Sequence, residues 1–229
     1  ASAPWPEYSS LSIIVTVVFY MHEKKRENPF INVNFFRSNL NITLIFGQYI
    51  LSTVIFFAVL LSFPTFLQSA IGTTSRTAGL VMLSLSIFAM VMTPIATRWM
   101  ERSGFRIPLL VSVGVGIIGV LMMFMVKGNS SLFLVGLVLA IIGISNGIQN
   151  IGLQNLLFTF IDKADSGIAS GLLMTSRFIG NILASSLYGI AFATGMGNQN
   201  MMTMTMVLLF IAALLFPGML YVTRRNKEA

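Results

Sequence analysis

The sequence is poor in the residues on which most soluble proteins depend. Its 229 residues include no cysteine, one histidine and only 9% charged residues. A soluble domain carries about 25% charged residues, so this chain cannot cover a water-facing surface, and a soluble globular fold is excluded. The lack of cysteine excludes a disulfide framework, a thiol nucleophile and a thiolate metal site. Because 55% of the residues are hydrophobic, disorder is excluded too, and the composition predicts an integral membrane protein.

Motifs of the common enzyme and metal sites are also absent. The sequence contains no P-loop, no HExxH zinc motif and no Ser/His/Asp set. The single histidine, His22, lies beside Glu23, Lys24 and Lys25, which favours a solvated side chain over a metal ligand. We therefore expect no catalytic residues, no metal and no cofactor, and we do not expect an enzyme.

Long apolar runs dominate what the sequence does contain. A membrane span needs about 20 mainly apolar residues. The seven candidate segments are Leu11–Met21, Ile42–Leu67, Ala78–Ala96, Ile107–Val126, Leu132–Phe160, Ile168–Ala193 and Met202–Val222. The first segment is short, so its outer end is expected to include Trp5 and Tyr8, which suit the aromatic belt at a membrane surface. The sequence thus predicts an all-α polytopic membrane protein.

The basic residues between the spans fall almost entirely on one side of the membrane. Arg76 and Lys127 lie in connections on the other side, and Arg177 falls within a span. The remaining eleven are Lys24, Lys25, Arg26, Arg37, Arg98, Arg102, Arg106, Lys163, Arg224, Arg225 and Lys227. Because cytoplasmic loops carry the excess of Lys and Arg, we expect a cell-membrane protein whose chain starts outside and ends in the cytoplasm. The net charge of +7 is therefore a topology signal, and no nucleic acid partner is expected.

The first residues of the sequence indicate whether the chain is part of a longer protein. The sequence begins Ala1-Ser2-Ala3, and an external start without a leader indicates the C-terminal part of a longer transporter. A natural seven-span protein is the alternative.

After the charged stretch 21–34, the six remaining spans form two groups of three joined at 127–131. An odd number of spans per group makes any structural repeat an inverted one.

The most informative connection is the loop 97–106, with the sequence TRWMERSGFR. Gly104 permits a tight turn. Glu101 is placed to pair with Arg98, with Arg102 or with a neighbouring helix end. Such a cluster can hold the cytoplasmic face closed in one state and release it in another, although an ordinary positive-inside loop is the alternative. The predicted cytoplasmic gating loop consists of Arg98, Glu101, Arg102, Gly104 and Arg106.

This loop resembles the signature G-x-x-x-D-R-x-G-R-R, which transporters of the major facilitator superfamily carry between the second and third helices of each half. Thr97 replaces the first Gly and Glu101 replaces the Asp. Arg102, Gly104 and Arg106 match in place or within one position. This is the degenerate form usual for a C-terminal half.

Three further stretches resemble the fourteen-span drug:proton antiporters of that superfamily. They are Glu23–Phe30 with Phe35–Ser38, Phe66–Gly72 with Ala78–Leu80, and Ser166–Gly171 followed by Arg177 and Gly180. The resemblance implies three regions: a last linker transmembrane helix at 1–22, a charged, amphipathic cytoplasmic linker at 23–40, and a six-helix C-terminal transport bundle at 41–229. It also implies that the bundle is built as a 3+3 inverted repeat.

Arg177 is the one charged residue in the middle of a span. It lies eleven residues after Ser166, which is about 16 Å along a helix and hence near the bilayer centre. A charge at that depth is costly unless it faces water, a partner or a substrate, so a functional site is the default hypothesis. The alternative is a structural arginine that either binds carbonyl groups of an adjacent helix or extends its side chain towards the cytoplasm. At helical spacing one polar stripe is formed by Ser170, Arg177, Asn181, Ser185 and Tyr188.

Two other spans carry polar side chains deep in the membrane. The span 132–160 has four amide side chains on one broad face, and the span 42–67 has a smaller polar pair. Such groups either bind neighbouring helices or line a wet cavity, and both interpretations are open here. The predicted substrate-cavity residues are Gln48, Ser52, Asn146, Gln149, Asn150, Arg177 and Asn181.

No Asp or Glu lies inside any span, and proton coupling normally needs a carboxylate or histidine within the membrane. In the resembling family such groups belong largely to the N-terminal half. This chain alone is therefore not expected to couple transport to protons.

The resemblance implies part of a secondary active transporter that exports amphipathic or cationic small molecules, a multidrug efflux pump. Its expected mechanism is proton antiport by alternating access, with the proton gradient as energy source. The expected partners are the lipid bilayer, a small-molecule substrate and the missing N-terminal bundle of the same transporter. Two alternatives stay open: a gradient-driven transporter of a metabolite or lipid, and a non-transporting seven-span assembly subunit.

Overall fold

The computed structural model describes residues 40–161, 165–193, 195 and 197–225. The linker helix expected at 1–22 lies outside these residues, as do His22 and all but the last residue of the linker expected at 23–40. The chain divides into two units, Ala1–Leu40 and Asn41–Ala229, and the second unit contains the helices described below except for Leu40, the first residue of the first helix.

Each of the six spans predicted in this part of the chain is a helix. The helices are α3 (Leu40–Ser69), α4 (Ser75–Ser103), α5 (Arg106–Met123), α6 (Leu132–Thr159), α7 (Ser166–Ala191) and α8 (Asn198–Arg225). All six are long and apolar enough to cross a membrane. Among the residues described, the all-α polytopic fold is thus confirmed.

Polar caps define where two of the helices begin. Thr74 Oγ1 accepts a hydrogen bond of 3.2 Å from the backbone N–H of Thr77 at the start of α4. Ser131 Oγ accepts one of 3.3 Å from the N–H of Leu134 at the start of α6. Each cap satisfies a backbone donor that has no partner within the helix, which stabilises the helix start by about 1 kcal/mol.

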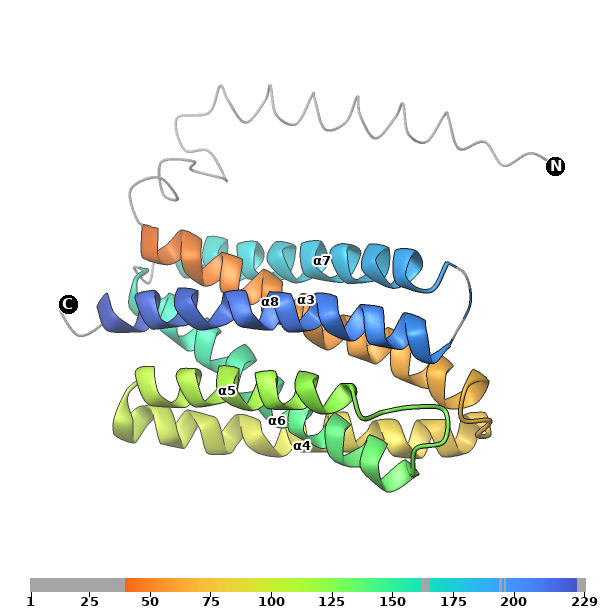
Figure 1. Cartoon of the computed structure of the whole chain (residues 1–229). Helices are drawn as coiled ribbons and strands as arrows, with labels where there is room; N and C mark the ends of the chain where they lie inside the picture. Colours follow the sequence, from red (N-terminus) through yellow and green to blue (C-terminus); the bar gives the residue numbers. More distant parts are fainter. Residues whose placement is uncertain (1–39, 162–164, 194, 196, 226–229) are drawn as a thin grey trace, which may run out of the picture. The chain divides into compact units, whose positions relative to one another are not determined.

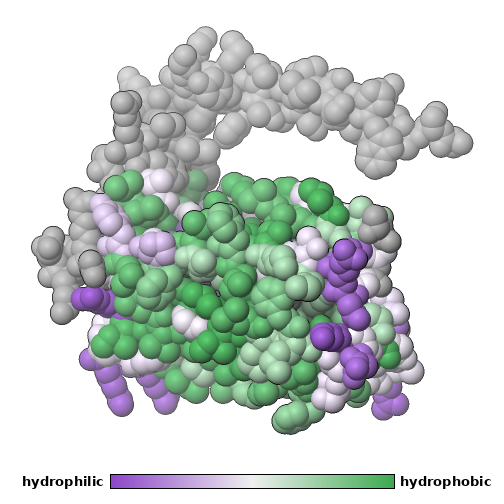
Figure 2. Space-filling model, in the orientation of Figure 1, coloured by the Kyte–Doolittle hydropathy of each residue, from purple (hydrophilic) through white to green (hydrophobic). Residues whose placement is uncertain are grey.

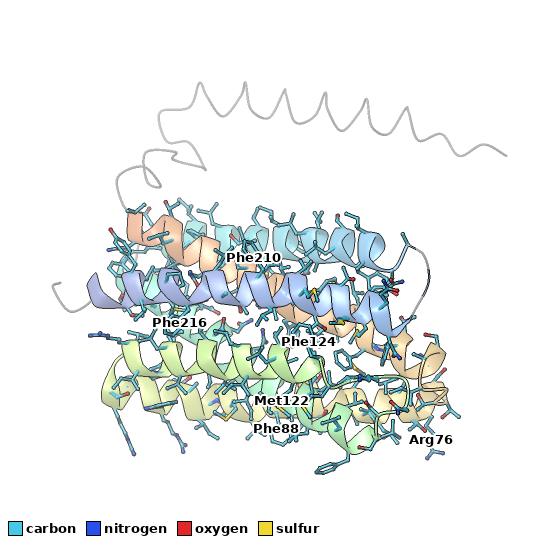
Figure 3. All side chains as sticks on the ribbon, in the orientation of Figure 1. Arg76, Phe88, Met122, Phe124, Phe210 and Phe216 are labelled. Atoms are coloured by element: carbon cyan, nitrogen blue, oxygen red, sulfur yellow. The ribbon has the colours of Figure 1, made fainter. Side chains whose placement is uncertain are left out.

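The helices run alternately in opposite directions, and this sorts the connections between the two ends of the bundle (Figure 1). The α4–α5 turn and the end of α8 lie at one end, whereas the α3–α4 and α5–α6 connections lie at the other. Arg76 is at this second end and points away from the helices (Figure 3). The predicted gating loop is therefore on the same end as the C-terminal end of α8.

Helix α6 is the central packing element. It contacts α4, α5 and α7, while α8 contacts α5 and α7. Gly143 and Gly147 of α6 stand directly against the backbone carbonyl oxygens of Leu85 and Ala89 of α4, so neither position has space for a Cβ atom. The two glycines let the α4 and α6 backbones approach closely, as small residues do between membrane helices.

The outer surface of the bundle is apolar along its middle. Figure 2 shows hydrophobic side chains covering the centre of the visible face, with hydrophilic residues gathered at the two ends. Large apolar side chains are exposed on α4 and α7, including Met90, Phe178 and Ile182, which are 68%, 63% and 64% exposed. Exposed apolar surface of this extent suits contact with lipid or with another apolar protein surface.

Candidate functional site

Three of the predicted cavity residues line one cavity inside the bundle. Ser52 of α3 meets Asn146 and Gln149 of α6 there, and α5 and α8 supply the remaining wall. The cavity has a volume of about 20 Å³, which is room for about one water molecule. Sites for drug-sized ligands occupy about 300–1,000 Å³, so a substrate of that size does not fit between these helices.

A chain of neutral hydrogen bonds fixes the polar groups beside this cavity. Ser145 Oγ donates to the carbonyl oxygen of Ser112 on α5 at 2.8 Å, and Gln149 Nε2 donates to Ser145 Oγ at 2.8 Å. Gly116 of α5 makes the approach possible, because a Cβ atom there would lie 2.6 Å from Ser145 Oγ. Gln149 is only 3% exposed and its Oε1 has no hydrogen-bond partner. These two hydrogen bonds join α5 to α6, and the buried Gln149 Oε1 is left without a donor.

The Ser145–Gln149 pair allows a test of what this interior polar chain contributes to stability. Ser145→Ala is expected to destabilise the protein by about 1–3 kcal/mol, because it leaves the buried Gln149 amide without its acceptor. In a Gln149→Leu background the same substitution should cost less, with a coupling energy of about 0.6–1.7 kcal/mol. Unfolding of the wild type, the two single variants and the double variant in mixed micelles measures this coupling, and strictly additive effects would contradict the pairing.

Gln48 is buried one turn before Ser52 but does not line the cavity. Its side chain is 5% exposed and lies against Gly218 of α8, where an added Cβ atom would collide with the Gln48 amide. Its Oε1 has no hydrogen-bond partner. The glycine on α8 therefore accommodates a buried amide from α3, and Gln48 contributes to the contact between these two helices.

Arg177 is directed at α3 and meets a tyrosine there. Arg177 Nη2 donates a hydrogen bond of 2.9 Å to Tyr49 Oη. Tyr49 is 4% exposed, whereas Arg177 is half-buried. One turn further, a Cβ atom on Gly180 would lie 2.8 Å from Thr53 Cβ and 3.0 Å from the carbonyl oxygen of Ile50. The absence of a side chain at Gly180 thus brings α7 close enough to α3 for the Arg177–Tyr49 bond.

The remaining predicted residues, Asn150 and Asn181, are half-buried and are not among the residues lining the interior cavity. Asn181 lies one turn after Arg177 on α7, next to Gly180. The structure therefore does not bring the predicted set together. Ser52, Asn146 and Gln149 line the interior cavity, and Arg177 belongs to the α3–α7 interface, here defined as Tyr49, Thr53, Arg177 and Gly180.

The predicted gating loop forms a very short connection. Helix α4 ends at Ser103 and α5 begins at Arg106, with Gly104 at φ 73° between them. This left-handed backbone conformation favours glycine, and the Gly104 N–H donates to the carbonyl oxygen of Met100 at 2.9 Å. The side chains of Arg98, Glu101 and Arg102 are exposed and that of Arg106 is half-buried. Their charged groups are therefore available at the end of the bundle.

The described part of the chain contains no group of three or more His, Cys, Asp or Glu side chains that could hold a metal ion. Polar atoms in the two places above are instead amides, hydroxyls and one guanidinium. Groups of these kinds can bind and orient a ligand through hydrogen bonds and charge.

Comparison with known proteins identifies the family. The family model of the Major Facilitator Superfamily matches residues 9–185, more than half of the chain. The chain belongs to the major facilitator superfamily. This superfamily is one of transporters, so the match and the six membrane-length helices point to a multi-pass membrane transporter rather than to an enzyme.

Several relatives within this superfamily are transporters from microorganisms. The chain is 29% identical over 192 residues to the uncharacterised MFS-type transporter YwoD of Bacillus subtilis, an alignment that covers 84% of this chain and 42% of YwoD. It is 29% identical over 182 residues to the multidrug resistance protein Stp of Mycobacterium tuberculosis, covering 77% of this chain and 32% of Stp.

A third relative comes from yeast. The chain is 26% identical over 189 residues to vacuolar basic amino acid transporter 2 of Saccharomyces cerevisiae, covering 80% of this chain and 38% of that protein. In all three comparisons the chain spans less than half of the relative's length. The resemblance of this chain to drug:proton antiporters is thus supported at the level of the superfamily and of a multidrug resistance relative.

Two residues of this major facilitator bundle were missed by sequence reasoning. Tyr49, the partner of Arg177, looks like an ordinary apolar-span residue, and its only signal is a hydroxyl that needs a partner when buried. Ser145, which links Gln149 to α5, has a still weaker signal because serine is common in membrane helices. Neither partnership is visible until the helices are packed.

Proposed function

We propose that this chain forms part of a secondary active transporter that exports amphipathic or cationic small molecules by proton antiport and alternating access. The observation that carries the proposal is Arg177, a half-buried cation in the middle of a membrane-length helix that hydrogen-bonds to Tyr49 of another helix. A charge placed there is costly and marks a substrate or ion pathway. The multidrug resistance relative Stp supports drugs as the substrate class.

The substrate cavity of the whole transporter would lie between this bundle and a second, N-terminal bundle. The interior cavity at Ser52, Asn146 and Gln149 holds about one water molecule, so a drug-sized site at these polar residues would have to be completed by another surface. The chain also covers only 42% of YwoD, which leaves length in a transporter of that size for a second bundle. The polar wall from this side would consist of Gln48, Ser52, Asn146, Gln149, Asn150, Arg177 and Asn181.

The loop between α4 and α5 would act as the cytoplasmic latch of this bundle. Its exposed Arg98, Glu101 and Arg102 can pair with charged groups of the second bundle in one state and separate from them in the other. The excess of basic residues at this end supports a cytoplasmic position for the latch in a cell-membrane protein. Only Gly104 and Phe105 separate the two helices, so the loop is short enough to transmit a movement of α4 to α5.

Protons would be carried by groups outside this bundle. Of the acidic residues, Glu101 lies in the last turn of α4 and Asp165 precedes α7, and none lies deeper within the six helices. Proton coupling normally requires a carboxylate or histidine within the membrane. We therefore assign proton binding to the N-terminal bundle and substrate contact to both bundles.

A transporter of a metabolite is the second candidate function, and the similarity to vacuolar basic amino acid transporter 2 favours it. The two functions are separated by a whole-cell experiment in an efflux-deficient bacterial strain. A drug exporter lowers the accumulation of ethidium in energised cells, and a protonophore abolishes this effect. Ethidium accumulation that is unaffected by the transporter, together with uptake or release of a basic amino acid, would favour the metabolite transporter instead.

A further inference from the structure

The positive charge of Arg177 has no counter-charge among the described residues. A guanidinium carries five N–H donors, and the structure gives Arg177 one hydrogen bond, to the neutral phenol of Tyr49. Asp165 precedes α7 and is twelve residues from Arg177 in sequence, which corresponds to about 18 Å along a helix. Glu101 lies in the last turn of α4, at the polar end of the bundle. The charge is thus half-buried and largely unsatisfied.

Nearby hydroxyl and amide groups do not supply the missing negative charge. Thr53 Oγ1 donates to the carbonyl oxygen of Tyr49 within α3 at 2.8 Å. Asn181 lies four residues after Arg177, so its side chain is on the same face of α7. Its amide adds two further N–H donors to the guanidinium. Arg177 and Asn181 therefore present N–H donors on one face of α7 beside a single positive charge, and donors of this kind bind carboxylates.

We infer that Arg177, together with Asn181, binds a carboxylate group within the membrane. This inference rests on the proposed transport function and narrows it, because a substrate held by this bundle would present an anionic group to α7. A purely cationic substrate would be repelled here and would have to place its charge near the second bundle. The same carboxylate chemistry is available from a side chain of that second bundle, and the experiment below separates the two sources.

The test uses the purified chain in nanodiscs of phosphatidylcholine and the fluorescent probe 11-(dansylamino)undecanoate, with its methyl ester as the uncharged match. Arg177→Gln is expected to raise the Kd of the carboxylate probe at least about tenfold and to leave binding of the ester unchanged. Arg177→Lys, which keeps the charge, is expected to stay within about threefold of the wild-type Kd. Asn181→Leu should raise the Kd by a smaller factor.

Arg76→Gln is the matched control, because it removes one positive charge from an exposed position at one end of the bundle, away from the middle of α7 where Arg177 lies. It is expected to leave the Kd unchanged. If Arg177→Gln binds the carboxylate probe as tightly as wild type, or if Arg76→Gln weakens binding equally, the inference is overturned. Arg177→Lys and Asn181→Leu keep the test decisive should Arg177→Gln fold poorly.

The source of the carboxylate follows from repeating the measurement on the full-length transporter. Persistent, Arg177-dependent binding of the probe indicates that a substrate carboxylate occupies the site. Loss of probe binding in the presence of the second bundle, with binding retained by the isolated chain, indicates a carboxylate of the protein itself. The binding assay needs no gradient. If probe binding depends on Arg177 but the transporter does not export drugs, the result therefore contradicts the proposed function alone. If export is normal but probe binding does not depend on Arg177, the result contradicts this inference alone.

Discussion

Arg177→Ala is expected to abolish export in the full-length transporter while the amount of protein in the membrane stays normal. Removing one partner of a desolvated, charged hydrogen bond costs about 2–5 kcal/mol, and the half-buried Arg177 is expected to fall near the lower limit. Because each 1.4 kcal/mol corresponds to about tenfold in affinity, export should fall by at least about 30-fold. The fold itself should survive, since the contact of Gly180 with Ile50 and Thr53 holds α7 against α3 without the arginine.

Initial rates of substrate efflux, normalised to the transporter detected in membranes, measure this effect. Met174→Ala is the matched control, because Met174 is on the same helix and its side chain is 55% exposed. Its expected export rate equals that of the wild type. Normal export by Arg177→Ala would contradict the functional interpretation and leave Arg177 as a structural residue that joins α7 to α3 through Tyr49.

Gly147→Ala is expected to lower the free energy of unfolding by about 1–3 kcal/mol, the usual cost of forcing extra atoms into a packed contact. The added Cβ would collide with the carbonyl oxygen of Ala89, and backbone atoms of α4 cannot move aside as a side chain can. Gly143→Ala should have the same effect through Leu85. The double substitution should separate α4 from α6, the helix with which α4 makes its main contact.

Gly136→Ala provides the control for this prediction on the same helix. A Cβ at Gly136 would lie 3.9 Å from Ser84 Oγ of α4, an ordinary van der Waals contact. We expect its unfolding free energy to remain within about 0.5 kcal/mol of wild type. Unfolding curves in mixed micelles compare the three variants directly. A Gly147→Ala protein as stable as Gly136→Ala would show that α4 and α6 are not packed backbone to backbone.

The helices of this bundle could be predicted well from the sequence because apolar runs of membrane length have few alternatives in lipid. Their ends were harder to predict. The span expected to run to Val126 leaves the regular helix at Met123, where the N–H groups of Phe124, Met125 and Val126 bond to carbonyl groups only three residues earlier. Hydropathy does not register this change because all three residues remain apolar.

The candidate site could be predicted only in part. Arg177 is evident from the sequence because a charge in mid-span is rare, and the structure directs it at Tyr49, which lies 128 residues away in the chain. Polar spacing alone suggested one cavity lined by seven residues. The structure separates Arg177 and Asn181 from the interior cavity, because only the packing of the helices decides which of their faces meet.

Proton-coupled export is tested most directly with the full-length transporter in liposomes that contain a trapped pH indicator. With an acidic lumen, adding ethidium outside should drive ethidium inward and protons outward, so that the lumen becomes more alkaline in step with dye uptake. The isolated bundle should give no such exchange, because no acidic residue lies within the central part of its helices. Ethidium movement without proton movement, or exchange catalysed by the isolated bundle, would contradict proton antiport through two bundles.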